Sequence, residues 1–564
     1  MAELKTWQVC VLVCMGLCCA VVLIIIIISY LVVEPGCSSG SFTHAAVSAD
    51  SRQCSDIGRD MLRRGGSAVD GAIAALLCTS VINPQSMGLG GGAIFTIRTN
   101  MAVILTSTGQ VKVYSSRETV PKSFKLNLLK DCPKDITFIK GSQWIGVPGE
   151  LRGYQHVHNL YGRLPWAELF QPTIELARRG TPLPAYLAYL LSNPLVGSLV
   201  QGSSLCQVFC NQNGTVLGKG DILKFPKLAD TMEIIAKQGA EALYSGQIGR
   251  DLVQDIREAG GTLTMDDLSS FRVRVADAWS ISLGKTRMHL PPPPSGGAIL
   301  GFILNIMKGF NLTSTNEDQR VQMYHRYVEA AKFANGQKHV IRDPVVNRVK
   351  NASYLLDGAF GDRVRKLIHD DRTHNDAYYN TTPSDDRFGT THVSVLGEDG
   401  MAVSVTSTIN QIFGSTIFSP RTGIILNNEL ADFCGRADSV KQGEQPPSSM
   451  APVILESSSG ETLVIGGSGG SMIITAVASA LINHLWLGMN LQDAIKARVV
   501  FVDSANKLNF EREFNETVKA GLQSLGHHMG DHKYFFNMVN AVAEQHGCIT
   551  AISDIRKMGQ ASGY

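Results

Sequence analysis

The chain has 564 residues, of which 44% are hydrophobic and 18% charged, and its formal net charge at pH 7 is +2. A chain of this length can bury a large core, either as several domains or as one large α/β unit. The nearly neutral charge, the lack of a Lys/Arg-rich run and the lack of zinc-like spacing of Cys and His argue against a nucleic-acid partner and a metal site.

The first predicted element is Val9–Val33, a nearly all-apolar run that is long enough to span a bilayer. No clean small-x-small exit for a signal peptidase follows it, so a retained signal-anchor is favoured over a cleaved signal. Lys5 before the run and Glu34 after it favour a cytoplasmic N-terminus. The sequence therefore predicts a single-pass type II protein of the plasma membrane, with a cytoplasmic tail at 1–8, an anchor at 9–33, a stem at 34–45 and an extracellular remainder.

Cysteines and glycosylation sequons also fit an extracellular location. Four cysteines lie in the apolar run, and eight follow it: Cys37, Cys54, Cys78, Cys132, Cys206, Cys210, Cys434 and Cys548. An even number in an oxidising compartment indicates disulfides, but the count leaves the pairing open. Five Asn-x-Ser/Thr sites fit a glycosylated surface protein: Asn213, Asn311, Asn351, Asn380 and Asn515.

The next elements indicate a globular body. Ser67 and Asp70 have the form of a capping box and open an apolar helix that runs through Cys78. The glycine-rich stretch 84–92 leads into a strand over 93–97. It lacks the Lys-Ser/Thr of a phosphate loop and the spacing of a dinucleotide fingerprint, so nucleotide binding is not expected. Close packing of backbone against backbone is the interpretation we favour for these glycines.

Helices and strands alternate along the remaining chain. Helices are predicted at 166–180, 227–259, 298–307 and 321–334, with a rigid proline turn at 291–294. Later come a strand-rich stretch at 415–426, an acidic turn at 427–432, a strand at 462–466, and an apolar helix that opens at 467–471 and runs to about 487. This pattern predicts a mixed α and β class with antiparallel pairing and no repeat of fixed period.

The centre of the sequence is a predicted β-hairpin that contains Thr390 and Thr408. Two runs of alternating apolar and polar residues flank the loop 398–400, and Gly400 is expected in the left-handed conformation. A loop of this length places Thr390 opposite Thr408, so that the two hydroxyls can meet across the ladder.

The stretch 371–389 before this hairpin is polar and rich in turn residues, as expected of an exposed loop that can be cut. Cleavage after Gly389 would leave Thr390 with a free α-amine. Because an α-amine titrates near ~7.7–8.0, it can act as the general base for the neighbouring hydroxyl. The ordinary alternative is a core hairpin beside a disordered loop.

Polar residues after the hairpin could complete a site for an amino acid. Glu429 and Asp432 are carboxylates suited to an ammonium group, and Ser448 and Ser449 are hydroxyls suited to a carboxylate. Amides at the helix start near 469–470 can stabilise an oxyanion. Each residue alone has an ordinary explanation as a turn, a surface acid or a helix start.

The chain from about residue 45 to the end resembles the γ-glutamyltransferase (glutathione hydrolase) family of N-terminal nucleophile hydrolases. The stretches that carry the resemblance are 83–92, 116–121, 144–154, 291–300, 390–395, 406–410, 425–433, 447–450, 466–470 and 562–564. The stretches 393–400 and 419–430 look most like the branch of the family that cleaves leukotriene C4.

The resemblance implies roles for particular residues. Thr390 matches the nucleophile and first residue of a small subunit (390–564), Thr408 matches the threonine that hydrogen-bonds it, and Gly469 and Gly470 match the oxyanion amides. Arg117, Ser448 and Ser449 match groups that bind the glutamyl α-carboxylate, whereas Asn410, Glu429 and Asp432 match groups around the α-amine. Cys54 with Cys78, and Cys206 with Cys210, match pairs that the family bridges.

The sequence departs from the family pattern at three places. Ser115-Ser116 precedes the arginine where Asn-Ala is common, and Ile412 replaces an aromatic residue of several members. The stretch 433–447 is shorter than the usual loop over the site. The last two departures bear on acceptor binding and transpeptidation, and not on the γ-glutamyl pocket.

The resemblance implies an α+β fold, a four-layer αββα sandwich that a large subunit (46–389) and the small subunit form as one unit. The implied activity is autocatalytic cleavage between Gly389 and Thr390, followed by hydrolysis or transfer of the γ-glutamyl group of glutathione and its conjugates, such as leukotriene C4. Water, an amino acid or a dipeptide accepts that group, and no cofactor is needed. Two alternatives stay open: another N-terminal nucleophile amidase, and a catalytically inactive surface glycoprotein.

Overall fold

The structure, a computed structural model, describes residues 15, 17, 20–22, 37, 40–99, 110–133, 138–347, 351–381, 389–531 and 537–564. None of the helices that these residues form has both the length and the apolar character needed to cross a membrane. The predicted tail 1–8 and most of the predicted anchor 9–33 lie outside the described residues.

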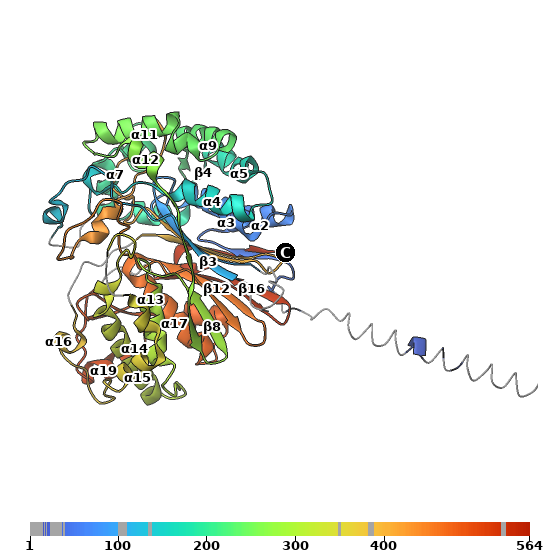
Figure 1. Cartoon of the computed structure of the whole chain (residues 1–564), viewed down its shortest axis with the longest axis vertical. Coiled ribbons are helices and arrows are strands. Elements are labelled where there is room, and N and C mark those ends of the chain that lie inside the picture. Colours follow the sequence, from blue (N-terminus) through green and yellow to red (C-terminus); the bar gives the residue numbers. More distant parts are fainter. Residues whose placement is uncertain are drawn as a thin grey trace, which may run out of the picture.

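Two antiparallel sheets lie face to face at the centre of the molecule (Figure 1). The first contains, in spatial order, β17 (Ser562–Gly563), β1 (Ala46–Ser48), β9 (Thr391–Leu396), β10 (Ala402–Thr408), β2 (Gly92–Thr99), β3 (Gln110–Ser115) and β6 (Arg274–Asp277). The second contains β16 (Cys548–Ile552), β15 (Met538–Gln545), β12 (Thr462–Ser468), β11 (Val453–Ser457), β8 (Thr286–Leu290) and β7 (Trp279–Leu283).

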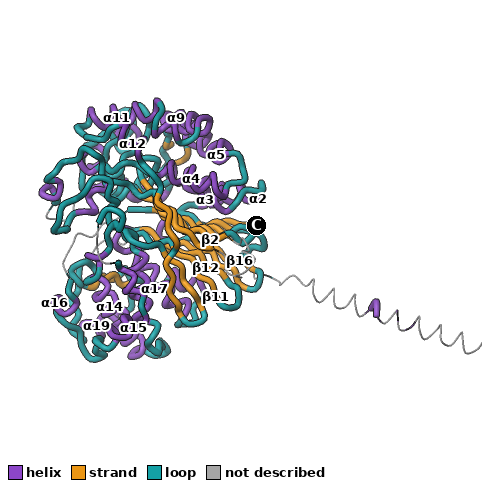
Figure 2. Tube along the Cα trace, in the orientation of Figure 1, coloured by secondary structure: helices purple, strands orange, loops and turns teal. Residues whose placement is uncertain are grey.

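Helices cover the outer side of each sheet, which gives four layers (Figure 2). On the first sheet lie α2 (Arg52–Arg63), α3 (Ala68–Ile82), α4 (Glu150–Tyr161), α5 (Trp166–Arg179), α9 (Pro226–Gln238) and α11 (Gln247–Glu258). On the second lie α13 (Gly297–Met307), α14 (Glu317–Asn335), α15 (Gly358–Arg365), α17 (Ile473–Leu485) and α19 (Glu516–Ser524). The predicted mixed class with antiparallel pairing is confirmed, and the layers follow the predicted αββα order.

The innermost helices are buried on all sides. Every residue of α3 is buried, and the predicted capping box of Ser67 and Asp70 starts this helix. Every residue of α13 is buried as well. Helices that are apolar all round belong inside a large core, which explains why these two form the layer next to the sheets.

The space between the sheets is partly polar. Apolar residues such as Ile454, Val464 and Val542 form one cluster there. Beside it, the Thr96 hydroxyl donates to the Pro452 carbonyl at 2.8 Å, and Ser404 donates to the Ile465 carbonyl at 3.1 Å. The polar face of the central hairpin therefore packs against the second sheet and not against water, which its alternating sequence pattern alone did not indicate.

Two of the predicted elements differ from the structure. The stretch 415–426 was expected to be strand-rich, but it forms only two isolated bridges, Phe418 with Ile425 and Leu426 with Gly90. Positive φ angles at Phe413 and Gly414 just before the stretch, and at Thr416 within it, interrupt the extended backbone. The predicted helix at 227–259 is three helices: α9, α10 (Glu241–Tyr244) and α11.

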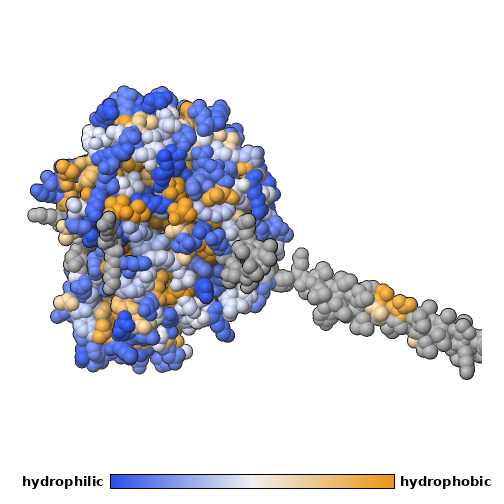
Figure 3. Space-filling view, in the orientation of Figure 1, coloured by the Kyte–Doolittle hydropathy of each residue, from blue (hydrophilic) through white to orange (hydrophobic). Residues whose placement is uncertain are grey.

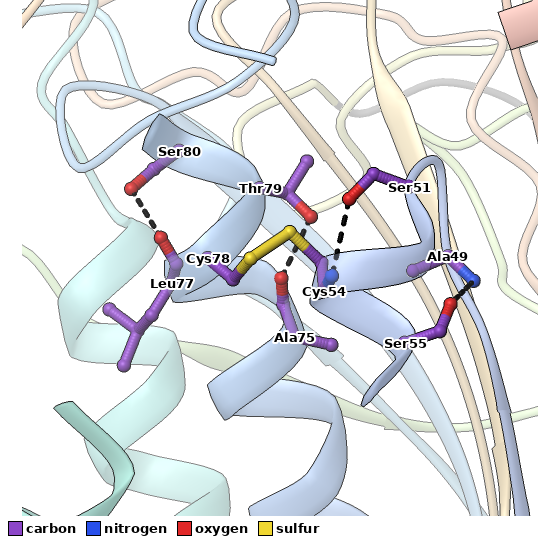
Figure 4. Close-up of a disulfide and its surroundings, with 9 residues drawn as sticks. All are labelled: Ala49, Ser51, Cys54, Ser55, Ala75, Leu77, Cys78, Thr79 and Ser80. Atoms are coloured by element: carbon purple, nitrogen blue, oxygen red, sulfur yellow. Dashed lines mark hydrogen bonds between the residues drawn. A yellow bond between two sulfur atoms is a disulfide. The ribbon is translucent and has the colours of Figure 1, made fainter. Parts of the chain in front are cut away.

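Four disulfides connect the eight cysteines beyond the apolar run. Cys54–Cys78 joins α2 to α3 (Figure 4), and Cys206–Cys210 closes a small loop, as the family resemblance implied. The remaining pairs, which the sequence left open, are Cys37–Cys548 and Cys132–Cys434. Both of these connect the part of the chain before Gly389 to the part after it.

One face of the molecule and the five sequon asparagines describe the outer surface. The face seen in Figure 3 is largely hydrophilic, with separate apolar areas between the polar ones. All five sequon asparagines are exposed, so each is accessible for modification; their glycosylation stays a prediction.

Candidate active site

The central hairpin brings two threonine hydroxyls together. β9 and β10 pair with Thr391 opposite Ser407, and Gly400 in the loop has φ +74°, as expected. Immediately beyond the paired residues, the Thr390 Oγ1 lies 3.1 Å from the Thr408 Oγ1, and both side chains are buried. The predicted register and the predicted hydroxyl contact are therefore present.

The glycine-rich loop 84–92 packs against the back of this hairpin. A Cβ added to Gly91 would lie 2.0 Å from the Thr408 carbonyl oxygen, and one added to Gly90 would lie 2.2 Å from the Ile425 carbonyl oxygen. Only glycine permits such close approach of backbone to backbone, which confirms the interpretation from sequence.

The peptide bond between Gly389 and Thr390 has an unusual local geometry. Thr390 has φ +83°, a left-handed conformation that is strained for a β-branched residue. The Gly389 carbonyl oxygen accepts a hydrogen bond of 2.9 Å from the Gly469 N–H. This donor polarises the carbonyl next to the Thr390 hydroxyl.

Two charged residues that sequence reasoning missed hold the other side of Thr390. The Lys557 ammonium donates to the Thr390 carbonyl oxygen at 2.8 Å and lies 2.5 Å from the Asp50 carboxylate. The Thr391 hydroxyl also donates to Asp50. Asp50 and Lys557 lie near opposite ends of the chain, and no motif or spacing connects them to the hairpin.

One cavity of about 330 Å³ contains nearly all the predicted site residues. Its lining includes Thr390, Thr408, Arg117, Asn410, Glu429, Asp432, Ser448, Ser449 and Gly470. Gly469 lies behind it and bonds to Gly389. The lining also includes Asn335 and Gly336 at the end of α14, which the sequence did not indicate as site residues.

Arg117 is fully buried and forms ion pairs with the two predicted acids, the buried Glu429 and the partly exposed Asp432. Its guanidinium lies 2.5 Å from Glu429 and 2.7 Å from Asp432. The carbonyls of Pro446 and Pro447 accept two more of its hydrogen bonds. Although burial alone would lower the pKa of Arg117, the two carboxylates raise it, so the guanidinium is charged.

Asn410 connects this ion-paired group to the hairpin. Its side-chain N–H groups donate to the Asp432 carboxylate at 3.0 Å and to the Asn428 carbonyl at 3.1 Å. Its backbone N–H donates to the Thr408 hydroxyl at 2.8 Å. The residue that orients Asp432 therefore also orients the partner of Thr390.

Two further buried acids lie behind the site. Burial and the nearby Glu429 raise the pKa of Glu118 well above its usual range. Burial raises the pKa of Glu150 to about 8, although the Ser407 hydroxyl donates to it at 2.8 Å. A protonated Glu118 leaves Arg117, Glu429 and Asp432 with one net negative charge, which suits an ammonium ligand.

The two serines lie on a loop fixed by the proline turn. The Ser448 N–H donates to the Pro294 carbonyl at 2.8 Å, and the Ser448 hydroxyl accepts from the Met450 N–H at 3.1 Å. The proline stretch is thus a rigid turn within the domain, as predicted. It sets where Ser448 and Ser449 face the cavity.

The three departures from the family pattern lie at different distances from the cavity. Ser116 is buried and donates to the Ala93 carbonyl at 3.1 Å. Ile412 is absent from the lining of the main cavity and instead borders a separate small cavity beside Gly389. From the short stretch 433–447, residues 434–437 line the main cavity, and Cys434 is bonded to Cys132.

Comparison with known proteins gives consistent matches. A family model described as gamma-glutamyltranspeptidase matches residues 54–564. The chain is 47% identical over 547 residues to glutathione hydrolase 5 proenzyme of Rattus norvegicus, covering 94% of each chain. It is 45% identical over 559 residues to the Homo sapiens protein of the same name, again covering 94% of each.

Solved structures match the fold at lower identity. A cephalosporin acylase from Bacillus halodurans matches with a TM-score of 0.81 and 22% identity, over 94% of this chain and 99% of that one. The Helicobacter pylori gamma-glutamyltranspeptidase matches with a TM-score of 0.53 and 24% identity, over 61% of this chain and 96% of that one. These likenesses support the four-layer fold.

Proposed function

The chain belongs to the gamma-glutamyltranspeptidase family and is a glutathione hydrolase, and we propose that Thr390 is its nucleophile, released by self-cleavage of the chain. The single observation that carries the proposal is the geometry at this residue. Its hydroxyl contacts Thr408, its preceding carbonyl is bonded to Gly469, and its backbone is strained.

In the proposed self-cleavage, the Thr390 Oγ attacks the Gly389 carbonyl carbon. The Gly469 N–H stabilises the oxyanion that develops on the Gly389 oxygen. The C–N bond breaks, its nitrogen takes the hydroxyl proton, and an ester joins Gly389 to the Thr390 side chain. Water then hydrolyses that ester, which leaves a carboxylate on Gly389 and an amine on Thr390. Release of the left-handed strain at Thr390 favours this step.

In the proposed catalytic cycle, the new amine of Thr390 accepts the proton of its own hydroxyl. The hydroxyl oxygen attacks the γ-amide of glutathione, with the amides of Gly469 and Gly470 at the oxyanion. The leaving amine takes the proton, and a γ-glutamyl ester forms on Thr390. Water hydrolyses this ester, or an amino acid or dipeptide takes the glutamyl group.

The ion-paired group beside Thr390 supports recognition of the amino-acid end of the substrate. Glu429 and Asp432 would bind the substrate ammonium, with Asn410 orienting Asp432. Arg117, Ser448 and Ser449, which line the same cavity, would bind the α-carboxylate. Arg117 already contacts both acids, so the substrate ammonium has to bind to carboxylates that are also paired with Arg117. Asp432 is the acid it can reach, because its side chain is 17% exposed.

Glutathione conjugates such as leukotriene C4 are the further substrates we propose. The supporting observation is similarity to the glutathione hydrolase 5 proteins over 94% of the chain. A comparison of kcat/KM for glutathione and leukotriene C4, with and without a dipeptide acceptor, tests this proposal.

We also propose that the mature protein is a heterodimer. Its first fragment ends at Gly389 and includes the apolar segment 9–33, the stem 34–45 and the large subunit 46–389, and its second fragment is 390–564. The apolar segment would hold the dimer outside the cell. Two disulfides, Cys37–Cys548 and Cys132–Cys434, would keep the two fragments covalently joined. The five exposed sequons support passage through the secretory pathway.

A second candidate activity is that of a side-chain acylase, because a cephalosporin acylase shares the fold. The buried Arg117 with its two acids argues against it, since an acyl group without an ammonium leaves the net negative charge of this group unmatched. Comparing hydrolysis of a γ-glutamyl anilide with that of an acyl substrate separates the two activities.

Self-cleavage is tested by electrophoresis of Thr390→Ala beside wild type and Thr390→Ser. Reduction is essential, because the two long disulfides keep the fragments together otherwise. Wild type and Thr390→Ser are expected to give two bands, and Thr390→Ala one. Two bands from Thr390→Ala would defeat the proposal, whereas one active band from wild type would show that cleavage is unnecessary.

A further inference from the structure

A cluster of buried polar side chains lies outside the catalytic cavity, where the end of the first fragment meets the second. His325, Glu329 and Lys332 lie on one face of α14, and all three are buried. His527 joins them from the turn after α19. We call these four, together with Thr373 and Tyr379, the Glu329 cluster.

Glu329 is the acceptor at the centre of the cluster. The Tyr379 hydroxyl lies 2.8 and 2.7 Å from its two oxygens, and the Thr373 hydroxyl donates to it at 2.7 Å. The Lys332 ammonium lies 3.7 Å from Glu329 and donates to the Thr373 oxygen at 2.7 Å. Both hydroxyls therefore use the Glu329 carboxylate as their hydrogen-bond acceptor, and the positive charge of Lys332 compensates the negative charge of Glu329.

The donors and acceptors of the histidines form one consistent chain. The Lys332 ammonium donates to His527 Nδ1 at 2.9 Å, so that nitrogen carries no proton. His325 Nε2 donates to the His369 carbonyl at 2.7 Å. The 2.8 Å contact between His325 Nδ1 and His527 Nε2 then holds a single proton, which belongs to His527.

A metal ion is the obvious alternative occupant, because the ligand atoms of His325, Glu329 and His527 lie within 4.8 Å of one another. The chain of hydrogen bonds argues against it. A cation would need both facing nitrogens without a proton, whereas their separation is that of a hydrogen bond. It would also lie close to the Lys332 ammonium, and like charges repel in a buried site.

The cluster fastens the stretch 373–381 to the body of the molecule, and two further contacts reinforce it. A Cβ added to Gly336 would lie 1.8 Å from the Tyr379 carbonyl oxygen, so the backbone there presses on a residue that lines the catalytic cavity. Asn506 donates to the Asp376 carboxylate and to the Thr381 hydroxyl, each at 2.9 Å. The first part of the predicted exposed loop is therefore firmly anchored.

We propose that the Glu329 cluster is a positioning site for self-cleavage. It holds the stretch 373–381 against Gly336, which lines the cavity, and thereby helps to keep the Gly389 carbonyl next to Gly469 and the Thr390 hydroxyl. Thr381 precedes Gly389 by eight residues, a reach of at most roughly 26–29 Å. Anchoring Tyr379 at the cavity therefore restricts the positions that Gly389 can sample. This inference rests on the proposed self-cleavage.

The sharpest variant is Tyr379→Phe, which removes the hydroxyl from Glu329 but keeps the ring that packs on Phe333. Its matched control is Tyr378→Phe at the preceding residue, whose hydroxyl donates to the Leu367 carbonyl and lies outside the cluster. Glu329→Gln serves as a second, stronger variant. The rate at which the fragment starting at Thr390 forms is followed after cell-free synthesis of the full chain, well below each variant's melting temperature.

Tyr379→Phe is expected to slow cleavage on the order of tenfold, because a buried hydrogen bond to a charged group is lost. Tyr378→Phe is expected to cleave like wild type. Once cleaved, Tyr379→Phe should show wild-type kcat per mole of fragment. A merely structural residue would instead lower the melting temperature and leave the cleavage rate at the assay temperature unchanged.

Three outcomes would overturn the inference. Wild-type cleavage rates in both Tyr379→Phe and Glu329→Gln would remove the positioning role while leaving self-cleavage intact. An uncut but active wild type would overturn self-cleavage and this inference together. About one zinc per chain in purified wild type, lost in His527→Ala, would show that the cluster is a metal site.

Discussion

The backbone conformation of Thr390 is held in part by a buried ion pair. The left-handed conformation of Thr390 is unfavourable by itself, and the structure maintains it with bonds on both sides. Gly469 holds the carbonyl before it, and Lys557, paired with Asp50, holds the carbonyl after it. The geometry of Thr390 therefore depends on an ion pair that its own sequence neighbourhood does not contain.

Lys557→Met is expected to lower the free energy of unfolding by about 3–5 kcal/mol, because it leaves the Asp50 carboxylate buried without a counter-charge. The double variant Asp50→Asn/Lys557→Met should recover part of this loss. Thermal melts of the single and double variants measure both effects. A single variant as stable as wild type would mean that the pair is not needed to hold this region.

Buried acids give the stability of the molecule a pH dependence. The pKa of Glu150 is raised to about 8 by burial, above its usual value. The folded state therefore binds a proton more tightly than the unfolded state, and the stability from this group is complete at low pH and lost as the pH rises toward 8.

Glu150→Gln is expected to flatten this dependence between pH 5 and pH 8. The amide stays neutral at every pH and can still accept from Ser407. Melting temperatures across this range, for wild type and variant, provide the measurement. Equal slopes for the two proteins would show that Glu150 is ionised in the folded state.

The buried His527 gives the stability a pH dependence opposite to that of Glu150. Burial and the nearby Lys332 lower the pKa of His527 to about 2. The neutral ring therefore contributes stability above the ordinary histidine pKa, and this stability is lost as the pH falls below it.

At the scale of elements, the hairpin β9–β10 and the glycine-rich loop behind it set the position of both threonines. The hairpin register was predictable, because the alternating pattern and the loop length permit only one pairing. The sequence predicted that the glycine-rich loop packs closely against another backbone segment, but it did not show that Gly91 packs against Thr408. The irregular stretch 415–426 was not predictable, because its β-branched and apolar residues are typical of strands, whereas positive φ angles before and within it prevent a continuous ladder.

Gly91→Ala is expected to disrupt the hairpin, because the new Cβ would meet the Thr408 carbonyl at 2.0 Å. We expect a loss of about 1–3 kcal/mol in stability together with slower self-cleavage. Gly88→Ala is the matched control in the same loop, since its Cβ would have no heavy atom within 4 Å. Both variants are followed by thermal melts and reducing electrophoresis, and equal behaviour of the two would refute the packing argument.

At the scale of the whole molecule, segments far apart in sequence converge on one cavity between the sheets and the helices. The acids, the serines and the glycines could be identified as residue types that suit this chemistry, and the family resemblance identified Arg117 and assigned the roles. The end of α14, Asp50 and Lys557 could not be found in this way. They reach the site only through the order of strands in two sheets, and that order depends on packing across the entire chain.

The two long disulfides make a prediction about the assembled protein. If the chain is cut after Gly389, the fragments should migrate together without reductant and separate with it. Replacing Cys132 and Cys434 by serine should leave Cys37–Cys548 as the only bridge between the described parts of the two fragments. Separation of wild-type fragments without reductant would contradict the observed pairing.

The most direct test of the account is mass spectrometry of the protein quenched in acid during turnover of a γ-glutamyl substrate. We predict a fragment that begins at Thr390 and carries one glutamyl group on that residue. An active protein in which Thr390 is still joined to Gly389, or in which the glutamyl group lies on another residue, would contradict it.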